Sequence, residues 1–317
     1  MNKKILLICP DFYDYKEKIE AELCERGYEV FSFNERPRRW VYTFVKRLLP
    51  NRLMHFFYDF YFLYYLGILE NNYDEFLCIR GEVVSIKFLE KLRESNPNIN
   101  SILYQWDSVN VTNFTRIMKY FDKVKTFDFE DSERFGLEYI PLFYGEEYYF
   151  DNLNNDLIYD LVYVGSFNNE RYAVINEIKK CCESIGLKYY FHLYISFPDY
   201  VKLKFFSNLN VKKEDVKFNI LTREDVVELN SKSRCVLDVE NIKQTGFTMR
   251  TFETLATGRM LITTNKNINK LVDFKEQYFF MDRDNISLPD DVSSFSPKRS
   301  KAISSYSLKN WLERILS

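Results

Sequence analysis

Short apolar runs alternate with amphipathic helical segments along most of this 317-residue chain. Residues 4–10 are predicted to form a buried strand, residues 15–26 a charged helix that ends before Gly27, and residues 28–33 the next strand. This alternation predicts parallel strands with helices on both faces, because each parallel connection has to cross the sheet. Such sheets bind ligands at the carboxyl ends of their strands, so the polar residues that follow each strand are candidates for function.

The alternation occurs twice, on either side of a polar stretch without clear periodicity at residues 145–156. Before it, strands are predicted at residues 75–80, 101–106, 124–128 and 138–141, and a helix at residues 85–95. After it, strands are predicted at residues 160–165, 189–195, 235–239 and 260–264, and helices at residues 169–185 and 223–232. The chain length also suits two domains of roughly 150 residues each. We expect one α/β domain over residues 1–148, a second over residues 149–301, and a hinge near residues 145–156.

The most informative motif covers residues 241–265 and is predicted to form a loop, a helix, a turn and a strand. Its two glycines, Gly246 and Gly258, stand at the boundaries of the helix. A helix that starts just after Gly246 presents free backbone N–H groups and a positive dipole end, which suit a phosphate. Arg250 and Glu253 lie one turn apart on one face, so they offer a cation for a diphosphate and a carboxylate for ribose hydroxyls.

This motif resembles the donor-site motif of GT-B glycosyltransferases, and more closely that of the CgeB-like branch of lipopolysaccharide or capsular polysaccharide biosynthesis. The shared pattern is Gly-hydrophobic-Thr-x-Arg-x-Phe-Glu from Gly246 to Glu253, followed by an Ala-x-Gly turn and a strand. In retaining members, two glutamates separated by seven residues flank the helix start. Glu253 matches the second glutamate, which holds the ribose, while Thr245 stands in place of the first. The departure favours inversion, although retention stays open.

The resemblance implies two Rossmann-like parallel-sheet domains that face each other across a cleft. Residues 1–148 would bind the acceptor, residues 149–301 would bind the nucleotide-sugar donor, and the amphipathic segment at residues 302–316 would pack back on the first domain. The implied activity is transfer of a sugar, by a hexosyltransferase, from a nucleotide-diphosphate sugar to a glycan or lipid-linked acceptor. The implied biological role is synthesis of a cell-surface polysaccharide: capsule, lipopolysaccharide or exopolysaccharide.

Further polar residues are expected to contact the donor. Gly165 and Ser166 end the predicted strand at residues 160–165, where the chain has to turn tightly, and Arg171 is near enough in sequence to assist. The predicted donor-binding set is Gly165, Ser166, Arg171, Gln244, Thr245, Gly246, Thr248, Arg250 and Glu253. The structural alternatives are an ordinary strand-to-helix turn at Gly165 and a surface ion pair between Arg250 and Glu253.

Asp107 is the candidate catalytic base, because it follows the predicted buried strand at residues 101–106. An acceptor hydroxyl has to lose its proton as the new glycosidic bond forms, and a carboxylate beside an aromatic side chain can have a raised pKa. Asp11 and Glu82 follow other predicted strands at comparable positions and are the rival candidates. A structural role, in which Asp107 only caps the following turn, is the further alternative.

Several other functional classes are disfavoured by composition. The nine glycines form no GxGxxG motif, which argues against a dinucleotide-dependent oxidoreductase. Two histidines leave little material for a histidine-based triad or metal site, and the first half has no Asp-x-Asp triplet at a strand end. A net charge of −2 gives no reason to expect nucleic-acid binding. We therefore predict metal-independent transfer without a cofactor other than the donor substrate.

Residues 38–69 form a second unusual region, in which basic residues are interleaved with Trp, Tyr, Phe and Leu: Arg38, Arg39, Lys46, Arg47 and Arg52. Pro50 and Asp59 interrupt the apolar run, so the segment is too short to span a bilayer. It suits an anionic membrane surface that carries a polyprenyl-linked acceptor, and it then places a cytoplasmic protein at the inner face of the plasma membrane. The alternative is a pair of helices buried between sheet and cleft.

Two other functions fit the same fold. A nucleotide-sugar epimerase binds the sugar nucleotide without an acceptor, and a scaffold of a polysaccharide assembly complex keeps the fold without catalysis. Retention of both Arg250 and Glu253 argues against the scaffold. The basic aromatic region at residues 38–69 would have no purpose in an epimerase.

Overall fold

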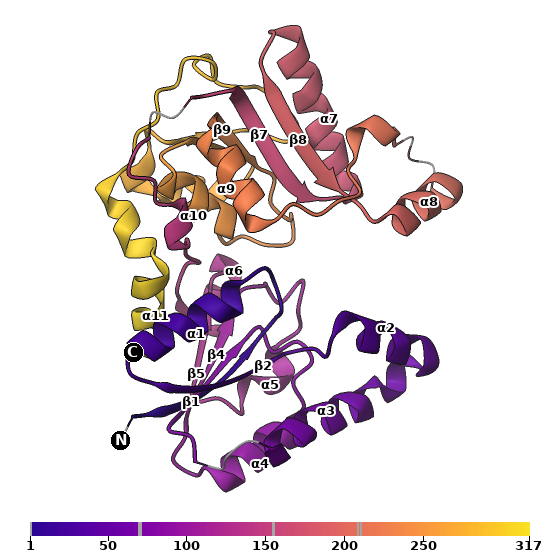
Figure 1. The fold of residues 1–317 in the computed structure, drawn as a ribbon, viewed down its shortest axis with the longest axis vertical. Helices are drawn as coiled ribbons and strands as arrows, with labels where there is room; N and C mark the ends of the chain where they lie inside the picture. The colour runs from indigo at the N-terminus through magenta and orange to yellow at the C-terminus, as the bar shows by residue number, and fades with distance from the viewer. Residues whose placement is uncertain (1, 69–71, 154–155, 208, 210) are drawn as a thin grey trace. The chain divides into compact units, whose positions relative to one another are not determined.

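The computed structural model describes residues 2–68, 72–153, 156–207, 209 and 211–317. It divides into two compact units, each built around one parallel sheet (Figure 1). The first unit contains the chain up to Leu142, Lys243–Gly246 and Leu308–Ser317, and the second contains Phe143–Ile242 and Phe247–Ser307. These limits differ from the predicted ranges 1–148 and 149–301, because residues 143–148 join the second unit and the segment before the motif helix joins the first.

The first unit has a six-stranded sheet in the order β2-β1-β3-β4-β5-β6, with parallel pairing throughout. The strands are β1 (Lys4–Cys9), β2 (Glu29–Asn34), β3 (Glu75–Ile79), β4 (Asn100–Gln105), β5 (Lys123–Thr126) and β6 (Glu138–Tyr139). The order reverses between β1 and β3, and such a switch point is where open parallel sheets bind ligands.

Helices cover both faces of this sheet: α1 (Tyr15–Glu25), α2 (Arg39–Leu48), α3 (Met54–Ile68), α4 (Ile86–Ser95), α5 (Thr115–Met118), α6 (Phe129–Phe135) and α11 (Leu308–Leu316). Leu6 and Ile8 of β1 pack in one core with Phe62 of α3 and Phe88 of α4. On the other face, the fully buried Trp311 of α11 meets Tyr104 of β4 edge to face, with ring centroids 5.1 Å apart. The alternation of β1 side chains between two buried faces explains why its sequence is continuously apolar.

The second unit has a five-stranded parallel sheet in the order β11-β10-β9-β7-β8. Its strands are β7 (Tyr159–Ser166), β8 (Tyr189–Tyr194), β9 (Ser233–Asp238), β10 (Met260–Thr263) and β11 (Tyr278–Phe280). Its helices are α7 (Asn169–Ser184), α8 (Phe197–Phe206), α9 (Arg223–Ser231) and α10 (Met249–Ala256). The order reverses between β7 and β9, which predicts the ligand site of this unit at their carboxyl ends.

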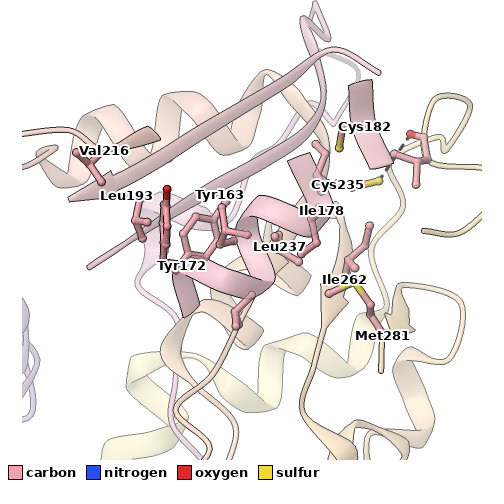
Figure 2. Packing of buried hydrophobic residues seen from close by; sticks show 14 of the residues in the cluster. Tyr163, Tyr172, Ile178, Cys182, Leu193, Val216, Cys235, Leu237, Ile262 and Met281 are labelled. Atoms are coloured by element: carbon pink, nitrogen blue, oxygen red, sulfur yellow. Dashed lines mark hydrogen bonds between the residues drawn. The ribbon is translucent and has the colours of Figure 1, made fainter. Parts of the chain in front are cut away.

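The core of the second unit lies between α7 and one face of its sheet (Figure 2). Tyr163 and Leu237 contribute from the strands, and Tyr172 and Ile178 contribute from the helix. Because alternate residues of β7 face opposite sides, Tyr163 and Gly165 share the α7 side of the sheet. Gly165 therefore comes directly after Tyr163 on that face.

The predicted α/β fold with two parallel sheets is confirmed, and the predicted strands agree with the observed ones within one or two residues at each end. Residues 302–316 were expected to form one amphipathic segment on the first domain. The structure instead has a 3₁₀ helix, η6 (Lys301–Tyr306), in the second unit and α11 in the first. Leu69, at the end of the basic aromatic region, lies outside the described residues.

Candidate functional site

The carboxyl ends of β7 and β9 bring together several predicted and several unpredicted residues of the second unit. The two strands pair from Tyr159 and Ser233 up to Val162 and Val236, and β7 then continues to the exposed Ser166. Strand β9 ends at Asp238, whose side chain is 2 % exposed. A buried carboxylate at this edge needs donors nearby, because an unpaired buried charge is costly.

Asp238 obtains its partners from the start of α10. Thr248 Oγ1 donates to Asp238 Oδ2 at 2.6 Å, and Thr251 Oγ1 donates to the same oxygen at 3.2 Å. Arg250 Nη1 lies 3.8 Å from Asp238 Oδ1. Asp238 therefore fixes the first turn of α10 against the end of β9. Sequence reasoning missed Asp238, because the predicted strand at residues 235–239 included it, whereas the observed β9 ends at this residue.

The helix start differs from the predicted one. The motif helix was expected to begin directly after Gly246, whereas α10 begins at Met249 and is capped by Thr248, whose Oγ1 accepts from Thr251 N at 3.2 Å. Arg250 also forms an ion pair with Asp238, a carboxylate that the surface alternative did not include. The first-turn N–H groups of α10, the Arg250 guanidinium and the end of β7 nevertheless belong to one unit, as the donor-site prediction requires.

Arg171 and Arg250 both approach the end of β7. Arg171 Nη1 donates to Ser166 O at 2.8 Å and Arg171 Nε donates to Val239 O at 3.1 Å, so this side chain ties together the ends of β7 and β9. The Arg250 guanidinium lies over the ring of Tyr163, 5.6 Å from its centroid. Two guanidinium groups at one strand edge make this edge electropositive and suited to an anion.

Glu253, the predicted ribose ligand, is 7 % exposed. It lies beside the buried Tyr148 of the 3₁₀ helix η2 (Glu146–Tyr148), where burial first and then the Glu253 carboxylate raise the pKa of the tyrosine. Arg223 Nη1 binds Glu147 Oε1 of the same short helix at 2.6 Å. The stretch expected to be a hinge thus supplies η2, which packs with α10 in the second unit.

The remaining members of the predicted donor set, Gln244, Thr245 and Gly246, are held by the first unit. Thr245 N and Gly246 N both donate to Asp128 Oδ2, at 2.6 and 3.1 Å, and Thr245 Oγ1 donates to Asp128 Oδ1 at 2.9 Å. A Cβ on Gly246 would lie 2.3 Å from Phe127 O. Glycine is therefore needed here for close approach to a backbone carbonyl. Its N–H, which was predicted to be available for a phosphate, is instead bonded to Asp128.

Asp107, the candidate base, lies half-buried after β4 and accepts a hydrogen bond from Gln244 Nε2 at 3.1 Å. Burial raises the pKa of its carboxyl, while the positive charge of Arg80 and the bond from Gln244 lower it. Ser108 Oγ also donates to Lys243 O at 2.8 Å, so the turn after β4 holds the 243–246 segment at two points. Asp107 is thus more than a cap of its own turn.

The rivals of Asp107 lie at the switch point of the first sheet. Glu82, after β3, is half-buried and forms ion pairs with Arg36 at 2.6 Å and Arg80 at 3.8 Å. Asp11, after β1, is exposed. Sequence reasoning also missed Glu35, a fully buried carboxylate directly after β2 that accepts from Arg80 Nε at 2.8 Å.

Among the residues that the structure describes, no helix is both long enough and apolar enough to cross a membrane. Nor do three or more His, Cys, Asp or Glu side chains in the described ranges come together in an arrangement that would hold a metal ion.

Solved structures of similar fold are GT-B enzymes. An apo structure of OtsA matches with a TM-score of 0.61 and 11 % identity, covering 99 % of this chain and 98 % of that one. MurG from Acinetobacter baumannii matches with a TM-score of 0.52 and 9 % identity, covering 99 % and 91 %. A structure described as a putative UDP-N-acetylglucosamine 2-epimerase from Listeria monocytogenes matches with a TM-score of 0.54 and 11 % identity, covering 100 % of this chain and 95 % of that one.

Neither a model of a known protein family nor a curated protein sequence matches this chain. At identities this low, the structural likeness establishes the GT-B fold and nothing finer.

The Asp128 carboxylate clamps the 243–246 segment by accepting hydrogen bonds from its backbone N–H groups. Replacing Asp128 with Ala removes the acceptor of the Thr245 and Gly246 N–H groups, and we expect their amide hydrogen exchange to accelerate by about 10- to 100-fold. Glu130→Ala is the matched control, since its side chain is exposed and its backbone N–H keeps its bond to Thr245 Oγ1. Unchanged exchange in Asp128→Ala, measured by mass spectrometry, would show that the clamp does not hold the segment.

Proposed function

We propose that this protein is a glycosyltransferase that transfers a sugar from a nucleotide-diphosphate donor to a glycan or lipid-linked acceptor. The observation that carries the proposal is the electropositive edge of the second sheet, in a chain with the GT-B fold. There the start of α10, Arg250 and the end of β7 meet at the switch point between β7 and β9.

The donor diphosphate would bind at this edge. The first turn of α10 supplies backbone N–H groups, and Arg250, whose guanidinium lies over the Tyr163 ring and 3.8 Å from Asp238, supplies a positive charge for phosphate oxygens. When the bond between the anomeric carbon and the diphosphate breaks, the leaving group takes the bonding electrons. Its added negative charge is stabilised by the guanidinium and the helix dipole. Glu253 remains our candidate for the ribose hydroxyls.

The acceptor chemistry is assigned to the first unit. In an inverting transfer, Asp107 takes the proton of the acceptor hydroxyl while that oxygen forms the new bond to the anomeric carbon. Burial raises the pKa of Asp107 above that of an ordinary aspartate, which makes the carboxylate a better proton acceptor. Gln244 fixes the orientation of the carboxylate through its bond to Oδ1. A retaining transfer would not need this base.

The cellular role that we propose is synthesis of a surface polysaccharide on a membrane-bound acceptor. Two rows of exposed apolar side chains support it, each with helical i, i+4, i+8 spacing. Trp40, Phe44 and Leu48 of α2 are 70, 60 and 65 % exposed, and Phe56, Phe60 and Tyr64 of α3 are 56, 70 and 57 % exposed. The other sides of the two helices pack on the sheet or on each other. The alternative of two helices buried between sheet and cleft therefore describes one side of each helix and not the exposed rows.

Charge favours an anionic lipid surface as the partner of these rows. Residues 38–67 contain five Arg or Lys residues and one acidic residue, a net charge of +4, whereas the whole chain carries −2. The acidic residue, Asp59, is already paired with Lys87 at 3.0 Å. Exposed aromatic residues with surrounding basic groups suit the boundary between lipid headgroups and acyl chains.

A nucleotide-sugar epimerase is the second candidate, because the UDP-N-acetylglucosamine 2-epimerase structure from Listeria monocytogenes shares the fold. Such an enzyme would use the same donor edge and would change the sugar without an acceptor. The two functions are separated by the product that forms.

Purified protein incubated with a panel of nucleotide sugars tests the donor site. We expect thermal stabilisation by at least one donor and release of nucleoside diphosphate when an acceptor is present. Arg250→Ala should weaken nucleotide binding by about 10- to 100-fold, because a charge-assisted contact is lost. Lys180→Ala, which removes an exposed positive charge from α7, should not. An isomerised donor without transfer would instead support the epimerase, and no stabilisation by any donor would support a scaffold.

The pH dependence of the rate tests the base. Because a general base acts when deprotonated and burial raises the pKa of Asp107, the rate should fall on acidification at a pH above the ordinary aspartate value of about 4. Asp107→Asn should lower the transfer rate at least about 100-fold and leave donor affinity unchanged. If Glu82→Gln or Asp11→Asn causes that loss while Asp107→Asn does not, the base is assigned wrongly.

Sedimentation with lipid vesicles tests the membrane surface. We expect binding to vesicles that contain phosphatidylglycerol, weaker binding to pure phosphatidylcholine vesicles, and loss of binding at high salt. Trp40→Ser with Phe44→Ser, and Lys46→Glu with Arg47→Glu, should each reduce binding about tenfold or more. Phe205→Ser with Phe206→Ser removes equally exposed aromatic residues from α8 and should have no effect. Equal partitioning of all variants would exclude this surface.

A further inference from the structure

The hydroxyl of Tyr163 is a buried polar group that the fold does not use. Tyr163 is 0 % exposed, and its Oη has no hydrogen-bond partner among the described residues. Burying a hydroxyl without a partner costs stability, and the cost is avoided by phenylalanine, which has the same shape without the hydroxyl. Packing alone therefore does not account for a tyrosine at this position.

Neighbouring Tyr172 shows what a structural tyrosine looks like in the same core (Figure 2). Tyr172 is also buried, but its hydroxyl donates to Asp215 Oδ2 at 3.0 Å and accepts from Lys212 N at 3.4 Å. The two tyrosines thus share one hydrophobic cluster and differ in whether the fold satisfies the hydroxyl.

The Tyr163 side chain lies along β7 towards its carboxyl end. A Cβ built on Gly165, two residues further on the same face, would lie 2.2 Å from Tyr163 Oη and 2.7 Å from its Cζ. Any side chain at position 165 would therefore collide with the phenol. Gly165 is needed because the hydroxyl reaches this point, next to the exposed Ser166.

Positive charge surrounds the phenol at the strand end. The Arg250 guanidinium covers the ring, 5.6 Å from its centroid, and Arg171 holds the carbonyl of Ser166. Burial raises the pKa of Tyr163, against the opposing effect of these two arginines, so the phenol keeps its proton at neutral pH. A protonated phenol with a guanidinium over its ring is a hydrogen-bond donor suited to an anionic oxygen.

We propose that Tyr163 Oη donates a hydrogen bond to a phosphate oxygen of a bound nucleoside diphosphate at the carboxyl end of β7, where the missing side chain of Gly165 makes room for the phenol. The proposal rests on the proposed function, since it places the donor diphosphate at the edge of β7 and β9. It assigns a contact to a residue that lies inside an apolar strand and outside the predicted donor set. It also gives Gly165 a role in accommodating the phenol rather than in contacting the phosphate.

The test compares Tyr163→Phe with wild type in two measurements, thermal unfolding of the unliganded protein and calorimetric titration with UDP, GDP and inorganic pyrophosphate. We expect Tyr163→Phe to raise the unfolding midpoint by about 2 to 4 °C, because an unsatisfied hydroxyl is removed. We expect the same change to weaken each nucleoside diphosphate that binds, and pyrophosphate, by about tenfold, because the lost contact is to phosphate.

Tyr172→Phe is the matched control. It should lower the unfolding midpoint, because Asp215 and Lys212 lose their partner, and leave nucleotide affinity unchanged. If the Tyr163 hydroxyl had only a structural role, Tyr163→Phe would give the same result, a lowered unfolding midpoint and unchanged nucleotide affinity.

The outcomes separate the inference from the function. If wild type binds a nucleoside diphosphate and Tyr163→Phe binds it equally, the role of Tyr163 is overturned and the donor site stands. Loss of affinity for UDP with unchanged affinity for pyrophosphate would also overturn the phosphate contact. If wild type binds neither the nucleoside diphosphates nor pyrophosphate, both proposals fail.

Discussion

Parallel pairing of strands is the constraint on which the rest of this structure depends. Every strand of a parallel sheet ends at the same edge, so residues distant in sequence are gathered there without any direct sequence signal. In the second unit this edge collects Ser166 from β7, Asp238 from β9 and the first turn of α10. The reversal of strand order between β7 and β9 leaves room at this point, since the connections leave towards opposite faces.

The same edges hold buried carboxylates, and their partners organise the local structure. Asp238 is 2 % exposed and binds the two threonines of the α10 start, while Asp128 is 1 % exposed and binds the backbone of the 243–246 segment. Glu35 is fully buried and pairs with Arg80. Because an unpaired buried charge is so costly, each carboxylate fixes the position of the loop or side chain that supplies its donors.

The sequence allowed the fold to be predicted, because period and boundary signals are local. The run at residues 4–10 and the helix that Gly27 ends correspond to β1 and α1 within one residue. The polar networks were harder to predict, because they depend on register and strand order. Asp238 ends a strand and Glu35 follows one, as Asp107 does, yet only the three-dimensional structure shows which carboxylates are paired. Tyr163 gave no signal at all, since a tyrosine inside an apolar strand is ordinarily part of the core.

Gly246 has a different role in the structure from the one that its position before a helix suggests. From sequence, a glycine before a helix indicates a phosphate-binding helix start, whereas here Phe127 O excludes any side chain and Asp128 takes the N–H. The motif thus joins two environments through one peptide segment: Gln244 contacts the candidate base, while Thr248 and Arg250 contact Asp238. The absent glutamate at Thr245 belongs to the first environment. The threonine therefore bears on Asp128, whereas the contacts with Asp238 are made by Thr248 and Arg250.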